Sequence, residues 1–212
     1  MNKENLIKKF YKINQELYKS AKNPLPSHGP EHHYRVLVNT LKIAKEFKKT
    51  DLEVLIPACL LHDLGAYYPE QAGSKYHEED FIRAKKVLDK ISFLSQEKKL
   101  KISQAVANHG SDPKYKSEKE SIETTILRDA DKLEAFGPLG VARIIMARCL
   151  QGDSLADIAK KYYLGGSLEK KWRSMTIRQA KIIGRDNYKY SLDFFSKLTK
   201  QLNADKENAT RV

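Results

Sequence analysis

The sequence predicts an all-α protein, a single compact domain built from several helices. Apolar residues recur at helical spacing in almost every segment, as at Leu6, Phe10 and Ile13. Segments rich in Pro, Gly and polar residues separate these stretches, and no alternation of apolar and polar residues indicates a strand. The 212 residues suffice for one well-packed core. We therefore expect one domain over residues 1–202, with motifs in 25–150, further helices in 155–202 and a frayed tail at 203–212.

In the first half of the chain, loops and capping residues bound the expected helices. Pro30 suits the first turn of the second helix, and Thr50 or Asp51 is expected to cap the third. Gly65 ends that third helix. The polar and aromatic segment 66–77 is expected to be a loop of the kind that covers a site. The expected helices here cover residues 3–19, 30–47, 52–63, 78–91 and 96–108.

In the second half, a polar loop at 110–121 precedes two helices separated by a turn at Gly137–Pro138. These helices are expected at 122–136 and 139–150. The stretch 152–174 is less regular, and a long amphipathic helix running from Ile177 to about Leu202 closes the domain.

The net charge and the two cysteines indicate the class of binding partner and the cellular compartment. A net charge of +12 favours an anionic, phosphate-containing small molecule. The basic residues are scattered, so a nucleic acid is the less favoured partner. No apolar run is long enough to span a membrane or to act as a secretory signal, which predicts a cytoplasmic protein without a membrane partner. Cys59 and Cys149 lie in apolar helical contexts, and both are predicted to be buried, reduced thiols.

Most of the six histidines stand at ends of predicted helices or beside the two longer loops. His62 and Asp63 end a strongly apolar helix, where a titratable pair is costly to bury without compensation. His109 follows the apolar stripe of Ile102 and Val106 and is expected to face the interior.

Three segments containing these residues resemble the signature segments of a known superfamily in order and spacing: "HHYRV" (32–36), "LLHDLG" (60–65) and "DADKLEA" (129–135). They are similar to those of the HD-domain metal-dependent phosphohydrolases. The last helix also resembles the C-terminal helix of small stand-alone bacterial and archaeal members. The resemblance implies a helical fold that holds one or two divalent ions.

By this resemblance the metal ligands are His32, His62, Asp63 and Asp131. Two imidazoles with two carboxylates suit Mn²⁺, Fe²⁺, Mg²⁺, Ni²⁺ or Zn²⁺. Asp129 and Asp131 point about 200° apart on a helix, and the helical phase does not choose between them. The Ala-Asp-x-Leu pattern of the family selects Asp131, which leaves Asp129 beside a ligand or in a structural role.

The resemblance also implies candidate groups for proton transfer. Asp63, or a neighbouring carboxylate, is expected to accept a proton from the attacking water. His77 and His109 match positions at which related members place histidines near the metal. There they would serve a second ion, the phosphate or general acid catalysis.

Three more residues are candidates for substrate binding. His28 precedes His32 by four positions and is expected to orient the substrate. Arg35 is expected either to bind the substrate phosphate or to form an ion pair with a ligand carboxylate, and Arg143 has a similar expected role. His33 is turned about 100° from His32 on the helix and is predicted to lie at the surface or beside a ligand.

The predicted reaction is hydrolysis of a phosphate ester or phosphoanhydride, most readily of a nucleotide, by metal-activated water without a covalent intermediate. Two alternatives stay open at this point. One is a binding module that senses nucleotides or RNA. The other is an oxygenase of the HD type with a di-iron centre, which His77 and His109 would permit.

Overall fold

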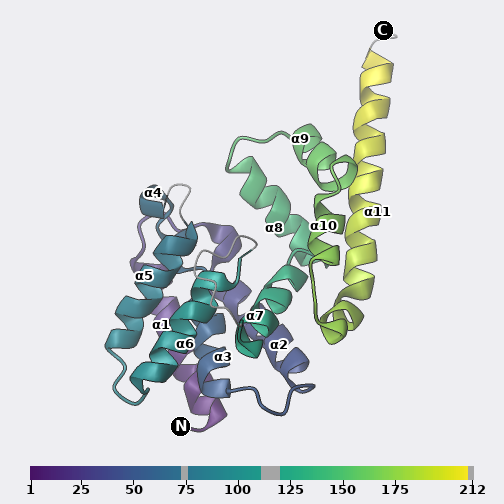
Figure 1. The fold of residues 1–212 in the computed structure, drawn as a ribbon. Coiled ribbons are helices and arrows are strands. Elements are labelled where there is room, and N and C mark those ends of the chain that lie inside the picture. Colours follow the sequence, from purple (N-terminus) through teal and green to yellow (C-terminus); the bar gives the residue numbers. More distant parts are fainter. Residues whose placement is uncertain (73–75, 111–119, 210–212) are drawn as a thin grey trace. The chain divides into compact units, whose positions relative to one another are not determined.

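The computed structural model describes residues 1–72, 76–110 and 120–209, with side chains for residues 1–70, 78–110 and 120–204. This part of the chain is helical and contains no strand, which confirms the all-α prediction (Figure 1). No helix in it is both long and apolar enough to cross a membrane.

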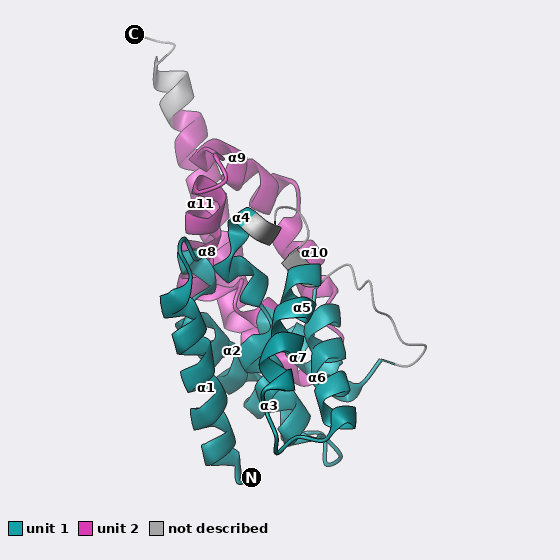
Figure 2. Cartoon of the chain, turned by 90° about the vertical axis from the view of Figure 1, so that its left-hand side faces the viewer, with its two compact units in different colours: residues 1–131 teal, residues 132–212 magenta. Residues whose placement is uncertain are grey.

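The chain divides into two compact units, residues 1–131 and 132–212 (Figure 2). One domain over residues 1–202 stays a prediction. Helix α7 begins in the first unit and ends just inside the second. The elements of the first unit are α1 (Lys3–Ser20), η1 (Pro26–His28), α2 (Pro30–Ala44), α3 (Leu52–Leu61), η2 (Leu64–Tyr67), α4 (Pro69–Ala72), α5 (Tyr76–Asp89), α6 (Gln96–Asn108) and α7 (Ile122–Leu133).

Helix α3 lies at the centre of the first unit. Asp51 is its cap and accepts a hydrogen bond from the backbone N–H of Glu53, which decides between the two predicted caps. Every residue from Val54 to Leu61 is buried, because α1, α2 and α6 all pack against this helix. The end of α3 therefore delivers His62 into the interior of the unit rather than to its surface.

The second unit contains α8 (Gly137–Cys149), α9 (Leu155–Ala159), the π-helical turn η3 (Lys160–Leu164), α10 (Ser167–Arg173) and α11 (Arg178–Ala209). Gly137 has a φ of +79°, and its N–H donates to Ser191 of α11. A side chain at Gly137 would be strained by this φ and would also meet Asn187 at 2.7 Å. Helix α11 continues past residue 202, where a frayed tail was expected to begin.

Three expectations from the sequence are wrong. Helix α3 ends at Leu61, so Gly65 does not end it and lies within η2 instead. The segment 66–77 is not the expected loop, because its described residues form η2, α4 and the start of α5, with Tyr68 between η2 and α4; residues 73–75 lie outside the described residues. The Tyr67 side chain is fully buried, and its hydroxyl donates to Asn14. Cys149 is exposed, because the last turn of α8 turns it outward, whereas Cys59 is buried as predicted. Both thiols are free.

Candidate metal centre

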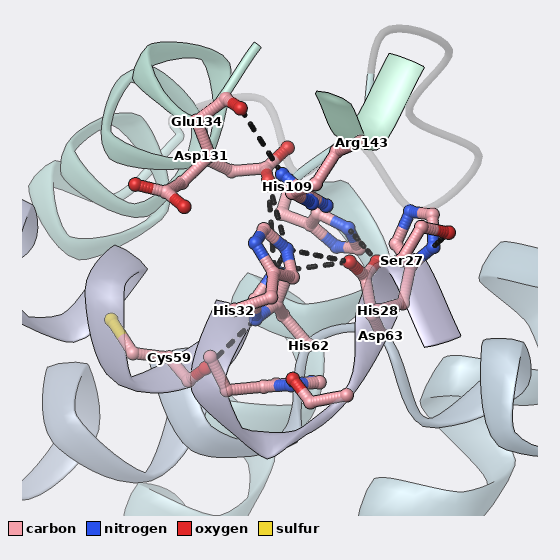
Figure 3. A network of polar contacts seen from close by, with 12 residues as sticks. Ser27, His28, His32, Cys59, His62, Asp63, His109, Asp131, Glu134 and Arg143 are labelled. Atoms are coloured by element: carbon pink, nitrogen blue, oxygen red, sulfur yellow. Dashed lines mark hydrogen bonds and ion pairs between the residues drawn. The ribbon is translucent and has the colours of Figure 1, made fainter. Parts of the chain in front are cut away.

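Two histidines and two aspartates meet inside the first unit, and three segments of the chain supply them (Figure 3). His32 lies in the first turn of α2, His62 caps the end of α3 and Asp63 follows it directly. Asp131 lies near the end of α7. One donor atom from each of the four lies within 4.8 Å of the other three. The structure thus brings together the four residues that the sequence predicted as metal ligands.

The individual distances show how closely the donor atoms converge. The Nε2 atoms of His32 and His62 are 3.3 Å apart, and each lies 3.2 Å from Oδ2 of Asp63. Oδ1 of Asp131 lies 3.4 Å from Nε2 of His32 and 3.8 Å from that of His62. The imidazoles are buried, while the side chains of Asp63 and Asp131 keep 16% and 25% of their exposure. Solvent therefore reaches this cluster on its carboxylate side.

A backbone contact fixes the orientation of the His62 ring. Its Nδ1 lies 2.7 Å from the carbonyl oxygen of Cys59. Because a carbonyl only accepts hydrogen bonds, Nδ1 carries the hydrogen, and the neutral ring directs the lone pair of Nε2 into the cluster. This is the form in which histidine binds a metal, so the donor set fits a divalent ion.

A second group shares Asp63 with the first. His109 is buried at the end of α6, as expected, and its Nε2 lies 3.1 Å from Oδ1 of Asp63. The backbone carbonyl of Val106 holds Nδ1 of the His109 ring. Donor atoms of Asp63, Asp80 and His109 lie within 4.8 Å of one another. One oxygen of Asp63 thus faces His32 and His62, and the other faces His109.

The close approach of these groups shifts their pKa values. Burial disfavours a charged His62, but Asp63 and Asp131 outweigh it and hold the pKa of His62 well above its usual value. Burial likewise favours neutral carboxyls, yet the facing histidines hold the pKa values of Asp63 and Asp131 well below the ordinary range. The pKa of His109 is also raised, because its contact with Asp63 exceeds the effect of burial. In the absence of a metal ion, His62 and His109 therefore stay protonated, and a cation bound to the cluster would replace the proton of His62.

A buried chain of hydrogen bonds lies beneath the cluster. Of the two places expected for His33, the structure shows the one beside a ligand: the ring is fully buried, and its centroid lies 4.7 Å from that of His62. Burial lowers the pKa of His33 well below its usual value, which keeps the ring neutral. Its Nδ1 lies 3.3 Å from the hydroxyl of Tyr67, which donates to Asn14. Asn14 in turn donates to the carbonyl of Leu60, so this chain ties α1, α2 and η2 to the end of α3.

The other predicted residues lie in different surroundings. Nδ1 of His28 is 2.8 Å from the hydroxyl of Ser27, and its ring centroid is 5.6 Å from that of His32. Arg35 is half-buried on α2, one turn beyond His32. Arg143 belongs to the second unit, where it donates to the carbonyl of Glu134. The side chain of His77 lies outside the described residues.

Two aspartates complete the description. Asp129 is buried on α7 but does not belong to either group of donor atoms. Asp80 was missed in the sequence because "HEEDF" resembles an exposed acidic helix start. A signal was present, since Asp80 lies four residues before Ala84 and eight before Leu88, which are both buried on α5. Its Oδ1 accepts a hydrogen bond of 2.6 Å from the N–H of Gly65, next to the His-Asp pair.

Comparison with known proteins gives a consistent result. The family model of the HD domain matches residues 30–135. A comparison with curated proteins finds no match. Among solved structures, a predicted HD superfamily hydrolase from an uncultured Thermotogales bacterium is 22% identical, with a TM-score of 0.61 over 92% of both chains.

Two structures from Bacillus species are similar to the same extent. Bacillus subtilis YpgQ in complex with ADP is 19% identical, with a TM-score of 0.65 over 92% of this chain and 97% of its own. An HD-superfamily hydrolase from Bacillus thuringiensis is 18% identical, with a TM-score of 0.64 over 96% of this chain and 100% of its own. At these identities the likeness is one of fold.

Proposed function

Because this chain belongs to the HD-domain family, we propose that it is a metal-dependent phosphohydrolase that cleaves a phosphate ester or phosphoanhydride, most readily that of a nucleotide. One observation carries the proposal: two imidazole and two carboxylate donor atoms converge within 4.8 Å inside the first unit. A divalent ion bound there supplies Lewis acidity toward water and toward a phosphoryl oxygen.

His32, His62, Asp63 and Asp131 would hold this ion. Imidazole donors suit Fe²⁺, Ni²⁺ and Zn²⁺, whereas carboxylates suit Mg²⁺ and Mn²⁺, so the mixed set favours a transition metal over Mg²⁺. The group of Asp63, Asp80 and His109 would hold a second ion if the centre is binuclear.

The contact between His109 and Asp63 suits His109 to proton transfer. Because the carbonyl of Val106 holds Nδ1, the exchangeable proton of His109 sits on Nε2, which faces Asp63. A protonated His109 ring would present that proton beside Asp63, where it is positioned for transfer to a leaving oxygen when a single ion is held by the other four side chains. The lowered pKa of Asp63 makes this carboxylate a weak base. Of the two groups, His109 is therefore the better candidate for moving a proton.

Two facts support a nucleotide as the substrate. The chain carries a net charge of +12, which attracts polyanions. YpgQ, which shares the fold, has been crystallised with ADP. His28 and Arg35, which lie near His32 on η1 and α2, are the candidate contacts of this unit to the substrate.

The test uses a matched pair of variants on α7, Asp131→Asn and Asp129→Asn. Each variant removes one carboxylate from α7, where Asp129 is buried and Asp131 is half-buried. Only Asp131 belongs to the donor cluster. We expect Asp131→Asn to lower bound metal and phosphate release by at least about 100-fold, since the loss of a residue that merely supports a ligand costs 10- to 100-fold. Asp129→Asn should retain its metal. Metal analysis and phosphate release from mono-, di- and triphosphates measure both effects.

Three outcomes would contradict the proposal. If Asp131→Asn keeps both metal and activity, the centre lies elsewhere. If the wild type binds iron and consumes O₂ without releasing phosphate, the oxygenase alternative is correct. If the metal-loaded protein binds nucleotide or RNA unchanged over hours and Asp131→Asn binds equally well, the chain is a binding module.

A further inference from the structure

A groove of about 610 Å³ lies on the first unit, and its lining comes mainly from α1 and α5. Its floor is apolar and consists of Ile13, Leu17, Leu64, Val87 and Ile91. This volume falls within the range of about 300–1,000 Å³ found for small-molecule sites. None of the metal-centre donor residues lines it.

The rim of the groove is positively charged. Arg83, Lys86 and Lys90 follow one another at spacings of three and four residues, which places them on one side of α5 and its end. Glu16 on α1 is the acidic residue of the lining. Three cations therefore face one carboxylate across an apolar floor.

The three cations are not equivalent. Arg83 is already held, because its Nε lies 3.1 Å from Glu79 and its guanidinium lies 3.6 Å from the ring centroid of Tyr68. Within the described part of the chain, no ion pair involves Lys86 or Lys90. These two ammonium groups are exposed at the groove and available to an anionic ligand.

We propose that this groove binds a small amphipathic anion, with an alkyl or aryl body on the floor and a carboxylate or phosphate head at Lys86 and Lys90. The lining favours such a molecule over a second nucleotide. It contains no Asn or Gln to pair with the edge of a base, and one face of the Tyr68 ring is taken by Arg83.

The groove also shares a wall with the metal centre. Leu64 on its floor directly follows Asp63. Asp80, on the same helix as Arg83, holds the N–H of Gly65. A ligand in the groove would thus contact η2, which begins directly after Asp63, and α5, whose Asp80 accepts the hydrogen bond from Gly65. The binding itself does not rest on the proposed function, because it needs neither metal nor phosphate release.

The test compares two probes of equal chain length and opposite charge, decanoate and decyltrimethylammonium, by calorimetry on the full chain. We expect decanoate to bind with a 1:1 ratio and at least about tenfold more tightly than the cation. Lys86→Glu should weaken decanoate binding by about tenfold or more. Lys85→Glu is the matched control, since Lys85 is exposed, pairs with Asp89 and does not line the groove. It should leave the affinity within about twofold.

A second variant keeps the test decisive. Leu17→Trp fills the floor and should abolish decanoate binding in a protein whose helical circular dichroism is unchanged. Equal binding of the two probes, or equal effects of Lys86→Glu and Lys85→Glu, would overturn the proposal. So would a doubled mass in light scattering that Leu17→Trp reduces to that of one chain, because the groove would then be covered by a second copy.

Discussion

The interiors of the two units differ in the side chains that fill them. All six histidines of the chain lie in residues 1–131. Of the five whose side chains the structure describes, four are buried: His32, His33, His62 and His109. In the described part of the second unit the buried residues are mostly aliphatic, and aromatic rings stack beside them. Trp172 and Tyr188 stack with centroids 4.4 Å apart, and Tyr162 stacks on the fully buried Phe195 at 5.6 Å.

This difference separates two sources of stability within one fold class. Buried imidazoles and carboxylates stabilise the first unit only while each has a charged or hydrogen-bonded partner, so protons and metal ions govern their contribution. Stacked rings contribute through buried area and packing, which neither pH nor a metal changes. We therefore expect pH and metal to change the stability of the first unit. In the second unit, we expect the loss of stability on truncating a side chain to follow from the area that the side chain buries.

The largest effect on stability is expected from Phe195→Ala in the second unit. Phe195 is fully buried, and its loss leaves a cavity against Tyr162, so the free energy of unfolding should fall by about 3–5 kcal/mol. Phe194→Ala is the matched control. The ring of Phe194 is only half-buried, so its removal should lower the free energy of unfolding by less. Denaturant titration measures both.

The same variant tests whether the two interiors are independent. The folded Phe195→Ala protein should bind as much metal per molecule as the wild type, since no donor residue lies in the second unit. Loss of metal from the folded variant would contradict the separation of the two interiors.

The sequence predicted the helices well because their apolar residues follow the helical period. The segment 96–108 matches α6 at both ends, and α1 extends only one residue beyond the expected 3–19. The donor cluster was predicted by resemblance, not by periodicity, and helical phase alone did not distinguish Asp129 from Asp131. The family pattern selected Asp131, and the fold separates the two aspartates in the same way, since Asp131 joins the cluster and Asp129 does not.

The errors share a physical cause, which is that burial depends on partners distant in the sequence. Tyr67 lies in a polar segment, but its hydroxyl finds Asn14, which is 53 residues away. From the sequence, Asp80 resembles a solvent-exposed acidic residue. Only the fold shows that its carboxylate accepts a hydrogen bond from the N–H of Gly65. Cys149 has apolar neighbours in the chain, yet nothing in the local pattern states that the end of α8 faces outward.

A smaller effect on stability is expected from Tyr67→Phe in the first unit. The change leaves the shape of the core almost unaltered but removes the hydroxyl that donates to Asn14. An unsatisfied buried acceptor costs about 1–3 kcal/mol, so the free energy of unfolding should fall by that amount. Tyr34→Phe is the control, because Tyr34 is 45% exposed and its loss of a hydroxyl should be nearly neutral.

The effect most specific to the first unit is the gradual pH dependence of the stability of the metal-free protein. Because the pKa of folded His62 is raised well above its usual value near 6.5, protonated His62 stabilises the fold below that value. This contribution is lost as the pH rises through the raised pKa, with a slope of about 1.4 kcal/mol per pH unit for one proton. The lowered pKa values of Asp63 and Asp131 have the opposite effect on the pH dependence. The ionised carboxylates stabilise the fold at neutral pH, and this stabilisation is lost only as the pH falls below the ordinary range of aspartate.

Thermal unfolding from pH 6.5 upward, with a chelator and with saturating Mn²⁺, measures this slope. A bound ion takes the place of the proton between the histidines and the carboxylates, so the decline should vanish in Mn²⁺ and metal should stabilise more at higher pH. His62→Gln should remove part of the slope and leave the part due to His109, whose pKa is also raised. The second unit contains no histidine, so it has no imidazole that could produce the same slope. A decline that persists in saturating Mn²⁺ would show that metal and protons do not compete for the same side chains.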